Sequence, residues 1–234
     1  MEDTILLGEE FIEFDEETNL LSHLTANEYL KVREVGVPKG YSKSQIVFTQ
    51  GDPHEGIYII ESGTVKAFYI GPNGKEITLA YWGAGHFVGG PEIFGKGEHM
   101  WSGTAETDAQ LLYLDGAKIR SLMESYPNLA IGIVEGLVFK GKCYSSLLQI
   151  LGTRSVLERL ASLFISIAEN ENHEDANQFK LKKQFTHDEL AKIVGSTRQW
   201  ITKSLDRFKK AGVIEYDGKN LVIKNLRALE DIIE

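Results

Sequence analysis

The chain has 234 residues, and its 25 lysines and arginines against 34 aspartates and glutamates give a formal net charge of −9. A content of 42% hydrophobic residues allows a buried core, and one cysteine, Cys143, excludes a disulfide framework, a four-cysteine iron–sulfur cluster and a cysteine zinc site. Residues 1–17 lack signal-peptide features and no apolar run reaches membrane-spanning length, so we expect a cytoplasmic protein without a membrane partner.

The first part of the chain, residues 1–125, is predicted to form an antiparallel β-roll. A short amphipathic stretch at 20–35 precedes several strand-like runs that are separated by glycine-containing turns. The Asn73-Gly74 pair is a strong hairpin signal, because both residues tolerate positive φ. The expected strands are 45–49, 56–61, 64–70, 76–82, 100–106 and 109–114.

A helical pattern begins at Asp115, and Pro127 marks the start of a long helix that we assign to 126–152. Six of its residues recur in steps of three and four, which is the spacing of a coiled-coil seam and predicts a symmetric parallel homodimer. The alternative is that this face packs on the chain's own roll. The seam residues are Ile133, Leu137, Lys140, Tyr144, Leu147 and Leu151.

The last part, residues 153–234, is predicted to be a winged helix-turn-helix. A helix at 154–169 and a polar loop at 170–177 precede a capping box, in which the Thr186 hydroxyl accepts from the backbone N–H of Glu189. That helix turns at Gly195, and a second helix starts after Ser196 or Thr197. Residues 212–223 follow as a hairpin, the wing. The apolar face of the second helix is expected to be Trp200, Ile201, Leu205 and Phe208.

The charge is unevenly divided along the chain. The residues before Gly152 contain 11 basic and 21 acidic side chains, a net charge of −10, whereas those from Gly152 onward have a net charge of +1. Within 178–227 there are 12 basic and five acidic residues, an excess of +7. A duplex-binding module needs such an excess to neutralise phosphates, although a solvated lysine-rich surface would also produce it.

The string FTHDELAKIVGSTRQWITKSLDRFKKAGVI at 185–214 resembles the helix-turn-helix of the cyclic-AMP receptor protein and fumarate-nitrate regulator (CRP/FNR) family. The roll resembles that family through Gly51-Asp52, GIYI at 56–59, Ser62-Gly63, Gly74 and GAGHFVGG at 83–90. The resemblance implies an α+β fold with an N-terminal jelly roll like that of cyclic-nucleotide-binding proteins, a dimerisation helix and a winged helix-turn-helix. It implies a non-enzymatic transcription regulator, active as a homodimer, with a palindromic double-stranded DNA operator and RNA polymerase as partners.

The positions that match the family's base-reading residues are Arg198, Gln199 and Lys203. Arg198 can grip guanine O6 and N7, Gln199 can pair with adenine N6 and N7, and Lys203 can take guanine or phosphate. We expect phosphate contacts from Thr197, Thr202 and Lys192. Trp200 is expected in the core, because it lies beside Ile201.

The effector pocket departs from the cyclic-nucleotide pattern. Family members that bind these nucleotides have a Gly-Glu pair followed by Arg-Ser; here Gly89 is followed by Gly90, and His99 and Met100 occupy the Arg-Ser positions. Cyclic AMP is therefore not the expected effector, and no cofactor is expected. We expect a small anion with an apolar or aromatic body, contacted by Gly89, Gly90, His99, Met100, Trp101, Tyr81, Phe87, Lys140 and Tyr144.

Lys140 is central to this hypothesis, because a charged side chain in an apolar seam needs a partner. Lys140 and Tyr144 match the positions at which family dimer helices touch the effector across the interface. A ligand that neutralises Lys140 would reset the helix that orients the DNA-binding parts. The alternatives are that Lys140 extends to solvent or pairs with Glu135 of the partner helix.

Other functions remain open at this point. His54, His86 and His99 are candidate ligands of a haem in a gas- or redox-sensing regulator of the same family. Cys143 is a candidate redox thiol, although a buried structural cysteine is commoner. A different class is a small-molecule-binding regulatory subunit without DNA binding, which the intact recognition helix disfavours.

Overall fold

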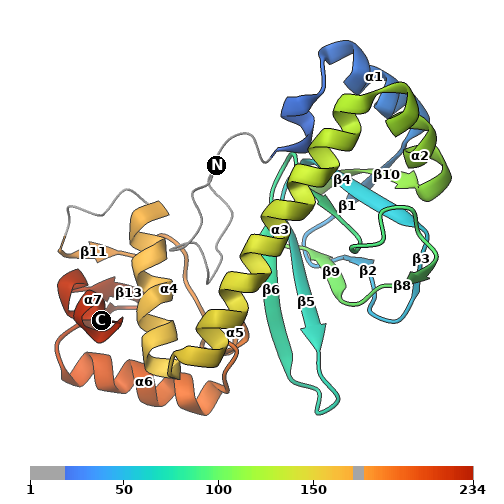
Figure 1. The fold of residues 1–234 in the computed structure, drawn as a ribbon. Coiled ribbons are helices and arrows are strands. Elements are labelled where there is room, and N and C mark those ends of the chain that lie inside the picture. Colours follow the sequence, from blue (N-terminus) through green and yellow to red (C-terminus); the bar gives the residue numbers. More distant parts are fainter. Residues whose placement is uncertain (1–18, 171–176, 234) are drawn as a thin grey trace.

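The computed structural model describes residues 19–170 and 177–233. An N-terminal β-roll and a C-terminal helical part with a small sheet are joined by one long helix, α3 (Pro127–Thr153), as Figure 1 shows. Residues 1–17 and most of the predicted polar loop lie outside the described residues. None of the helices in these two ranges combines the length and apolarity needed to cross a membrane.

The roll consists of two antiparallel four-stranded sheets, with strand orders β1-β10-β4-β7 and β2-β9-β5-β6, and a short β3-β8 pair. Ile60, Val65 and Trp82 are fully buried in its core. The predicted antiparallel roll is confirmed, and each of the six expected strands overlaps an observed one. The strands are β1 (Val37–Tyr41), β2 (Ile46–Phe48), β3 (Pro53–His54), β4 (Gly56–Ser62), β5 (Val65–Ile70), β6 (Glu76–Trp82), β7 (Phe87–Val88), β8 (Gly97–Glu98), β9 (Ser102–Ala105) and β10 (Ala109–Asp115).

Strands β5 and β6 form a long hairpin whose tip is the predicted Asn-Gly turn. Gly74 has φ +76°, and Asn73 Oδ1 accepts a hydrogen bond from the Lys75 backbone N–H at 3.0 Å. Along β6 the side chains alternate, so Trp82 packs in the core of the roll while Tyr81 packs against the C-terminal core. This hairpin therefore touches both halves of the protein.

Helix α3 follows η3 (Leu20–His23), α1 (Ala26–Val35), the roll and α2 (Gly116–Ser125), and it begins at Pro127 as predicted. The face that carries the predicted seam is covered by the chain itself. Ile133, Lys140 and Leu147 are buried and the other three seam residues are half-buried, against the cores of the roll and of the C-terminal part. The predicted seam therefore packs within one protomer, which is the alternative to a coiled-coil dimer through this face.

Another face of α3 is open, and it has the same heptad spacing in a different phase. Val138 is 54% exposed and Leu148 is 71% exposed. A Cβ added to Gly141, between them, would meet no atom within 4 Å. We call this face the outer stripe; it consists of Ile131, Val134, Val138, Gly141, Ser145 and Leu148.

The C-terminal part is a helix-turn-helix with a wing, as predicted. The Thr186–Glu189 capping box opens α5, and Gly195, at φ +62°, makes the turn to α6. Phe164 and Phe208 are fully buried in its core. Its elements are α4 (Val156–Asn170), β11 (Phe179–Lys180), α5 (His187–Ile193), α6 (Arg198–Lys210), the wing strands β12 (Ile214–Asp217) and β13 (Asn220–Ile223), and α7 (Leu226–Ile233).

Candidate functional site

The predicted base-reading residues lie on the exposed face of α6. Burial of Ile201 and Leu205 fixes the opposite face, which leaves Arg198, Gln199 and Lys203 in solvent near the start of the helix. Arg198 Nη1 is 3.8 Å from Asp188 Oδ2, in an exposed pair that is weak enough to be exchanged for another partner. The three side chains can therefore reach a ligand that lies along α6.

The three predicted phosphate contacts have their polar atoms engaged inside the protein. Thr197 caps α6 by accepting from the Trp200 backbone N–H at 3.4 Å. Thr202 Oγ1 donates to the Arg198 carbonyl at 3.0 Å and lies 2.8 Å from His187 Nδ1, which ties α6 to α5. Lys192, on α5, pairs with the roll.

Trp200 is not in the core, contrary to the prediction. Its side chain is 56% exposed, because one residue along a helix is a rotation of about 100°, which separates it from the buried Ile201. Lys203 Nζ lies 5.0 Å from the centroid of the indole ring. An aromatic side chain thus stands among the exposed polar residues of α6.

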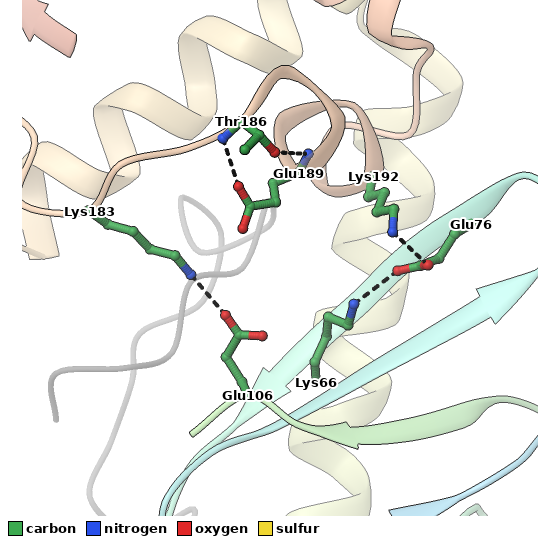
Figure 2. Close-up of polar contacts among 7 residues, drawn as sticks. All are labelled: Lys66, Glu76, Glu106, Lys183, Thr186, Glu189 and Lys192. Atoms are coloured by element: carbon green, nitrogen blue, oxygen red, sulfur yellow. Dashed lines mark hydrogen bonds and ion pairs between the residues drawn. The ribbon is translucent and has the colours of Figure 1, made fainter. Parts of the chain in front are cut away.

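A carboxylate of the roll holds Lys192, as Figure 2 shows. Lys192 Nζ is 2.8 Å from one oxygen of Glu76, and Lys66 Nζ is 2.9 Å from the other. Burial would raise the pKa of Glu76, but the hydrogen bonds from Lys192 and Lys66 lower it below its ordinary value. Glu76 is thus ionised and shared between a roll lysine and a lysine of the helix-turn-helix.

Two further contacts cross the same boundary. Lys75 Nζ, at the hairpin tip, donates to the Gly195 carbonyl at 3.0 Å, so it holds the turn between α5 and α6. Lys183 Nζ is 3.1 Å from Glu106 Oε1 (Figure 2). The helix-turn-helix is therefore fixed to the roll by polar contacts that salt can screen.

Lys140 carries a buried amine without a counter-ion among the described residues. Its Nζ is 3.2 Å from the centroid of Trp82 and 5.1 Å from that of Phe87, and it has no hydrogen-bond partner within the described ranges. Burial lowers the pKa of Lys140 to about 7. The aromatic faces compensate part of the lost hydration, and an anion would compensate the remainder.

Aromatic side chains surround this ammonium. The ring centroid of Tyr144 lies 5.7 Å from that of Trp101 and 6.5 Å from that of Trp82, and the Tyr144 and Trp82 rings meet edge-on. His86 is 5.4 Å from Trp82, and burial, with the charge of Lys140, lowers the pKa of His86 to about 3, so it is neutral. We call Lys140, Trp82, His86, Phe87, Trp101 and Tyr144 the Lys140 cluster.

Four members of this cluster are among the effector residues predicted from the sequence, and two are not. His86 is predicted only as a haem ligand, and Trp82 has no predicted role. Alternation along β6 was the available signal for Trp82, because an inward Ala80 predicts an inward Trp82.

The structure separates the other predicted effector residues from Lys140. Tyr81 packs on the opposite side of β6, with Lys183 Nζ 5.5 Å from its ring, and Met100 is 60% exposed. His99 Nδ1 lies 2.5 Å from the Gly89 carbonyl, and a Cβ on Gly90 would strike His54. The residues predicted to line a single pocket therefore do not form one site. The Lys140 cluster is separate from the group around His99, and it contains the unpaired amine.

No group of three or more histidine, cysteine, aspartate or glutamate side chains in 19–170 and 177–233 is placed to hold a metal ion. Cys143 is buried in α3. Glu135, the alternative partner considered for Lys140, lies 2.8 Å from His23 Nε2 of its own chain.

Comparison with known proteins agrees with both halves of the fold. Residues 38–126 match the cyclic nucleotide-binding domain family, and residues 158–232 match the Crp-like helix-turn-helix domain family. The chain is 26% identical over 199 residues to a CRP-like cAMP-activated global transcriptional regulator of Mycobacterium tuberculosis, covering 85% of this chain and 87% of that one. It is 26% identical to the fumarate and nitrate reduction regulatory protein of Salmonella typhimurium, covering 82% and 76%. Its fold matches that of the c-di-GMP responsive global regulator CLP of Xanthomonas campestris with a TM-score of 0.76 at 19% identity, covering 85% and 99%.

Proposed function

Because the chain belongs to the CRP/FNR family of DNA-binding transcription regulators, we propose that it acts as a homodimer on a palindromic operator and that its effector is a small aromatic anion. The observation that carries the effector assignment is the unpaired ammonium of Lys140. Its surroundings supply rings but no negative charge, so a ligand with one anionic group and a flat apolar body complements them.

Several features weigh against a cyclic nucleotide. The Mycobacterium relative is named for activation by cyclic AMP, but this chain has Gly90 where nucleotide-binding members have the glutamate that holds the ribose. Gly90 also lies against His54, a buried histidine whose ring nitrogens have no hydrogen-bond partner among the described residues. Lys140 lies on α3 rather than in the loop after Gly89, so the anion would sit against the long helix.

The dimer is supported by the outer stripe of α3. Its exposed apolar side chains are spaced by three and four residues. The outer stripes of two chains would therefore pack against each other as a parallel coiled coil. Gly141 and Ser145 interrupt the apolar side chains and allow the two helices to approach closely at that level. The opposite face of α3 carries Lys140, so each helix contacts the effector site and the partner on different sides.

Replacing Lys140 by methionine should stabilise the ligand-free protein. Between the ordinary lysine pKa of 10.5 and about 7, the unfolded chain binds the proton that the folded chain lacks, so stability falls as the pH is lowered through this range. Removing the amine should therefore raise the free energy of unfolding at pH 7 by about 4 kcal/mol and flatten its dependence between pH 7 and 10. Denaturant unfolding at both pH values measures this.

The matched control is Lys142→Met, which changes an exposed lysine of the same helix. An unchanged pH dependence in Lys140→Met would contradict the buried, uncompensated charge. For the effector itself, thermal unfolding and operator binding are measured with benzoate, phenyl phosphate and cyclic AMP. We expect a response to an aromatic anion in the native protein and none in Lys140→Met; an equal response in both would overturn the assignment.

A further inference from the structure

Trp200 is a large aromatic side chain that lies outside the buried face of α6. It projects from α6 with 56% of its surface exposed, although Ile201, Ser204, Leu205 and Phe208 already fill the buried face of that helix. An indole that is exposed among polar side chains is available for contact with a ligand, and tryptophan is enriched among the residues that dominate binding interfaces. Its neighbours on the helix are Gln199 and Lys203, both exposed and polar.

We propose that Trp200 reads a thymine of the operator through its 5-methyl group, a contact that rests on the DNA-binding function of α6. The thymine methyl is the apolar group that base pairs present in the major groove, and it fits the face of an indole. Trp200 follows Arg198 and Gln199 in the first turn of α6, so this turn would present an apolar reader after two residues that offer hydrogen bonds to guanine and adenine. Lys203, over the same ring, places its ammonium beside this contact.

The test begins with an operator enriched from a randomised duplex library by the full-length native protein. Each symmetric thymine pair is then replaced by deoxyuridine, which removes only the methyl groups. Replacement of one of these pairs should weaken binding by the native protein about fourfold per half-site, which corresponds to the loss of one buried methyl group. The same replacement should not change binding by Trp200→Ala. The control is Tyr216→Ala, an exposed aromatic of the wing that should keep the native dependence on the methyl group.

The outcomes separate the two levels of the proposal. Equal thymine dependence in the native protein and in Trp200→Ala overturns the role of Trp200 while leaving DNA binding intact. Failure to enrich any sequence overturns the operator function together with it. Since Trp200 is exposed, its removal should leave the circular dichroism and unfolding temperature unchanged, so a binding loss is not a folding defect.

A second inference comes from the contacts in Figure 2. Lys192 was expected to bind a DNA phosphate, yet its ammonium is held by Glu76, whose side chain is only 17% exposed. The adjoining hairpin tip holds the turn at Gly195 through Lys75. Strand β6 runs from Glu76 to Trp82, and Trp82 lies under Lys140, so one strand connects the effector cluster to the helix-turn-helix.

We infer that the Glu76–Lys192 pair is an autoinhibitory latch, which withholds Lys192 from DNA and opens when the protein binds its operator. An ammonium cannot give its full charge to a carboxylate and to a phosphate at once, so the two contacts compete. Ligand-induced movement of Trp82 along β6 would be transmitted to this pair. The latch does not depend on which base Trp200 contacts.

A double-mutant cycle tests the latch, with affinity for the enriched duplex measured at constant salt. Glu76→Gln alone should bind DNA about tenfold more tightly. Because the loss of any negative charge from the protein strengthens its binding to a polyanion, this result alone does not test the latch. The decisive comparison is the effect of Lys192→Gln in the native protein and in Glu76→Gln. If Lys192 is withheld, Lys192→Gln has little effect in the native protein and weakens Glu76→Gln at least fivefold. An equal effect in both backgrounds overturns the latch, and unfolding temperatures of all four proteins verify that each is folded.

Discussion

Replacing Arg198 by alanine is expected to remove most of the sequence preference of DNA binding while leaving non-specific binding nearly intact. Arg198 is exposed at the start of α6, and its weak pair with Asp188 leaves the guanidinium free for a bidentate contact to guanine. Loss of such a contact costs about 1–3 kcal/mol, or roughly 5- to 150-fold in affinity, and a dimer would lose it twice. The affinity ratio between the enriched duplex and a scrambled duplex measures the effect.

Lys209→Ala provides the contrast for this prediction. Lys209 is an exposed cation of the same helix, but it lies in the last turn of α6, far from the predicted base contacts. A cation that meets only phosphates contributes equally to every sequence, so its loss should lower both affinities in parallel. If Arg198→Ala also lowered both affinities in parallel, Arg198 would be a phosphate contact and the prediction would be wrong.

Local signals predicted the elements that local chemistry stabilises. The Thr186–Glu189 capping box, the Asn73-Gly74 turn and the start of α3 at Pro127 all appear where the sequence placed them. Each depends on hydrogen bonds or dihedral angles within a few residues, which a sequence contains completely.

Elements stabilised by distant partners were missed. Strand β1 contains Pro38 and Gly40, which argue against a strand, but it lies at the edge of its sheet, where proline is tolerated. The two-residue strands β3 and β8 exist because they pair with each other across more than forty positions of the chain. No local propensity specifies such a pair.

The same limit explains the errors in the site. Tyr81 and Trp82 are adjacent aromatic residues on opposite sides of β6. Alternation with Ala80 indicates that Trp82 faces the core of the roll, but only the docking of β6 between two cores brings its ring against Lys140. On α3 a spacing of three and four residues is satisfied by two sets, one beginning at Ile131 and the other at Ile133. Both are apolar in part, so periodicity alone could not choose the face that the roll covers.

A glutamate at Val138 is expected to abolish the dimer, because it would bring two like charges together in the centre of the outer stripe. Val138 is half exposed in the single chain, so the protomer should fold normally, with an unchanged unfolding temperature under conditions in which it is monomeric. An uncompensated buried charge costs several kcal/mol, which corresponds to at least about 100-fold in the dimer dissociation constant. Sedimentation equilibrium measures this constant, and DNA binding to the palindromic duplex should fall with it.

Two comparison variants distinguish the two possible faces of α3. Gln149→Glu adds the same charge at an exposed position beside the stripe and should leave the dimer intact. Leu147→Ala truncates a side chain of the seam predicted from sequence, which is buried within the protomer; it should lower the free energy of unfolding by about 2–5 kcal/mol without weakening association of the folded chains. If Leu147→Ala dissociated the dimer of folded chains and Val138→Glu did not, α3 would associate through the face that now covers the roll. Such a dimer would require Lys140 to leave its aromatic cluster. The effect of Val138→Glu on dimerisation therefore also shows whether the effector site and the dimer interface lie on different faces of α3.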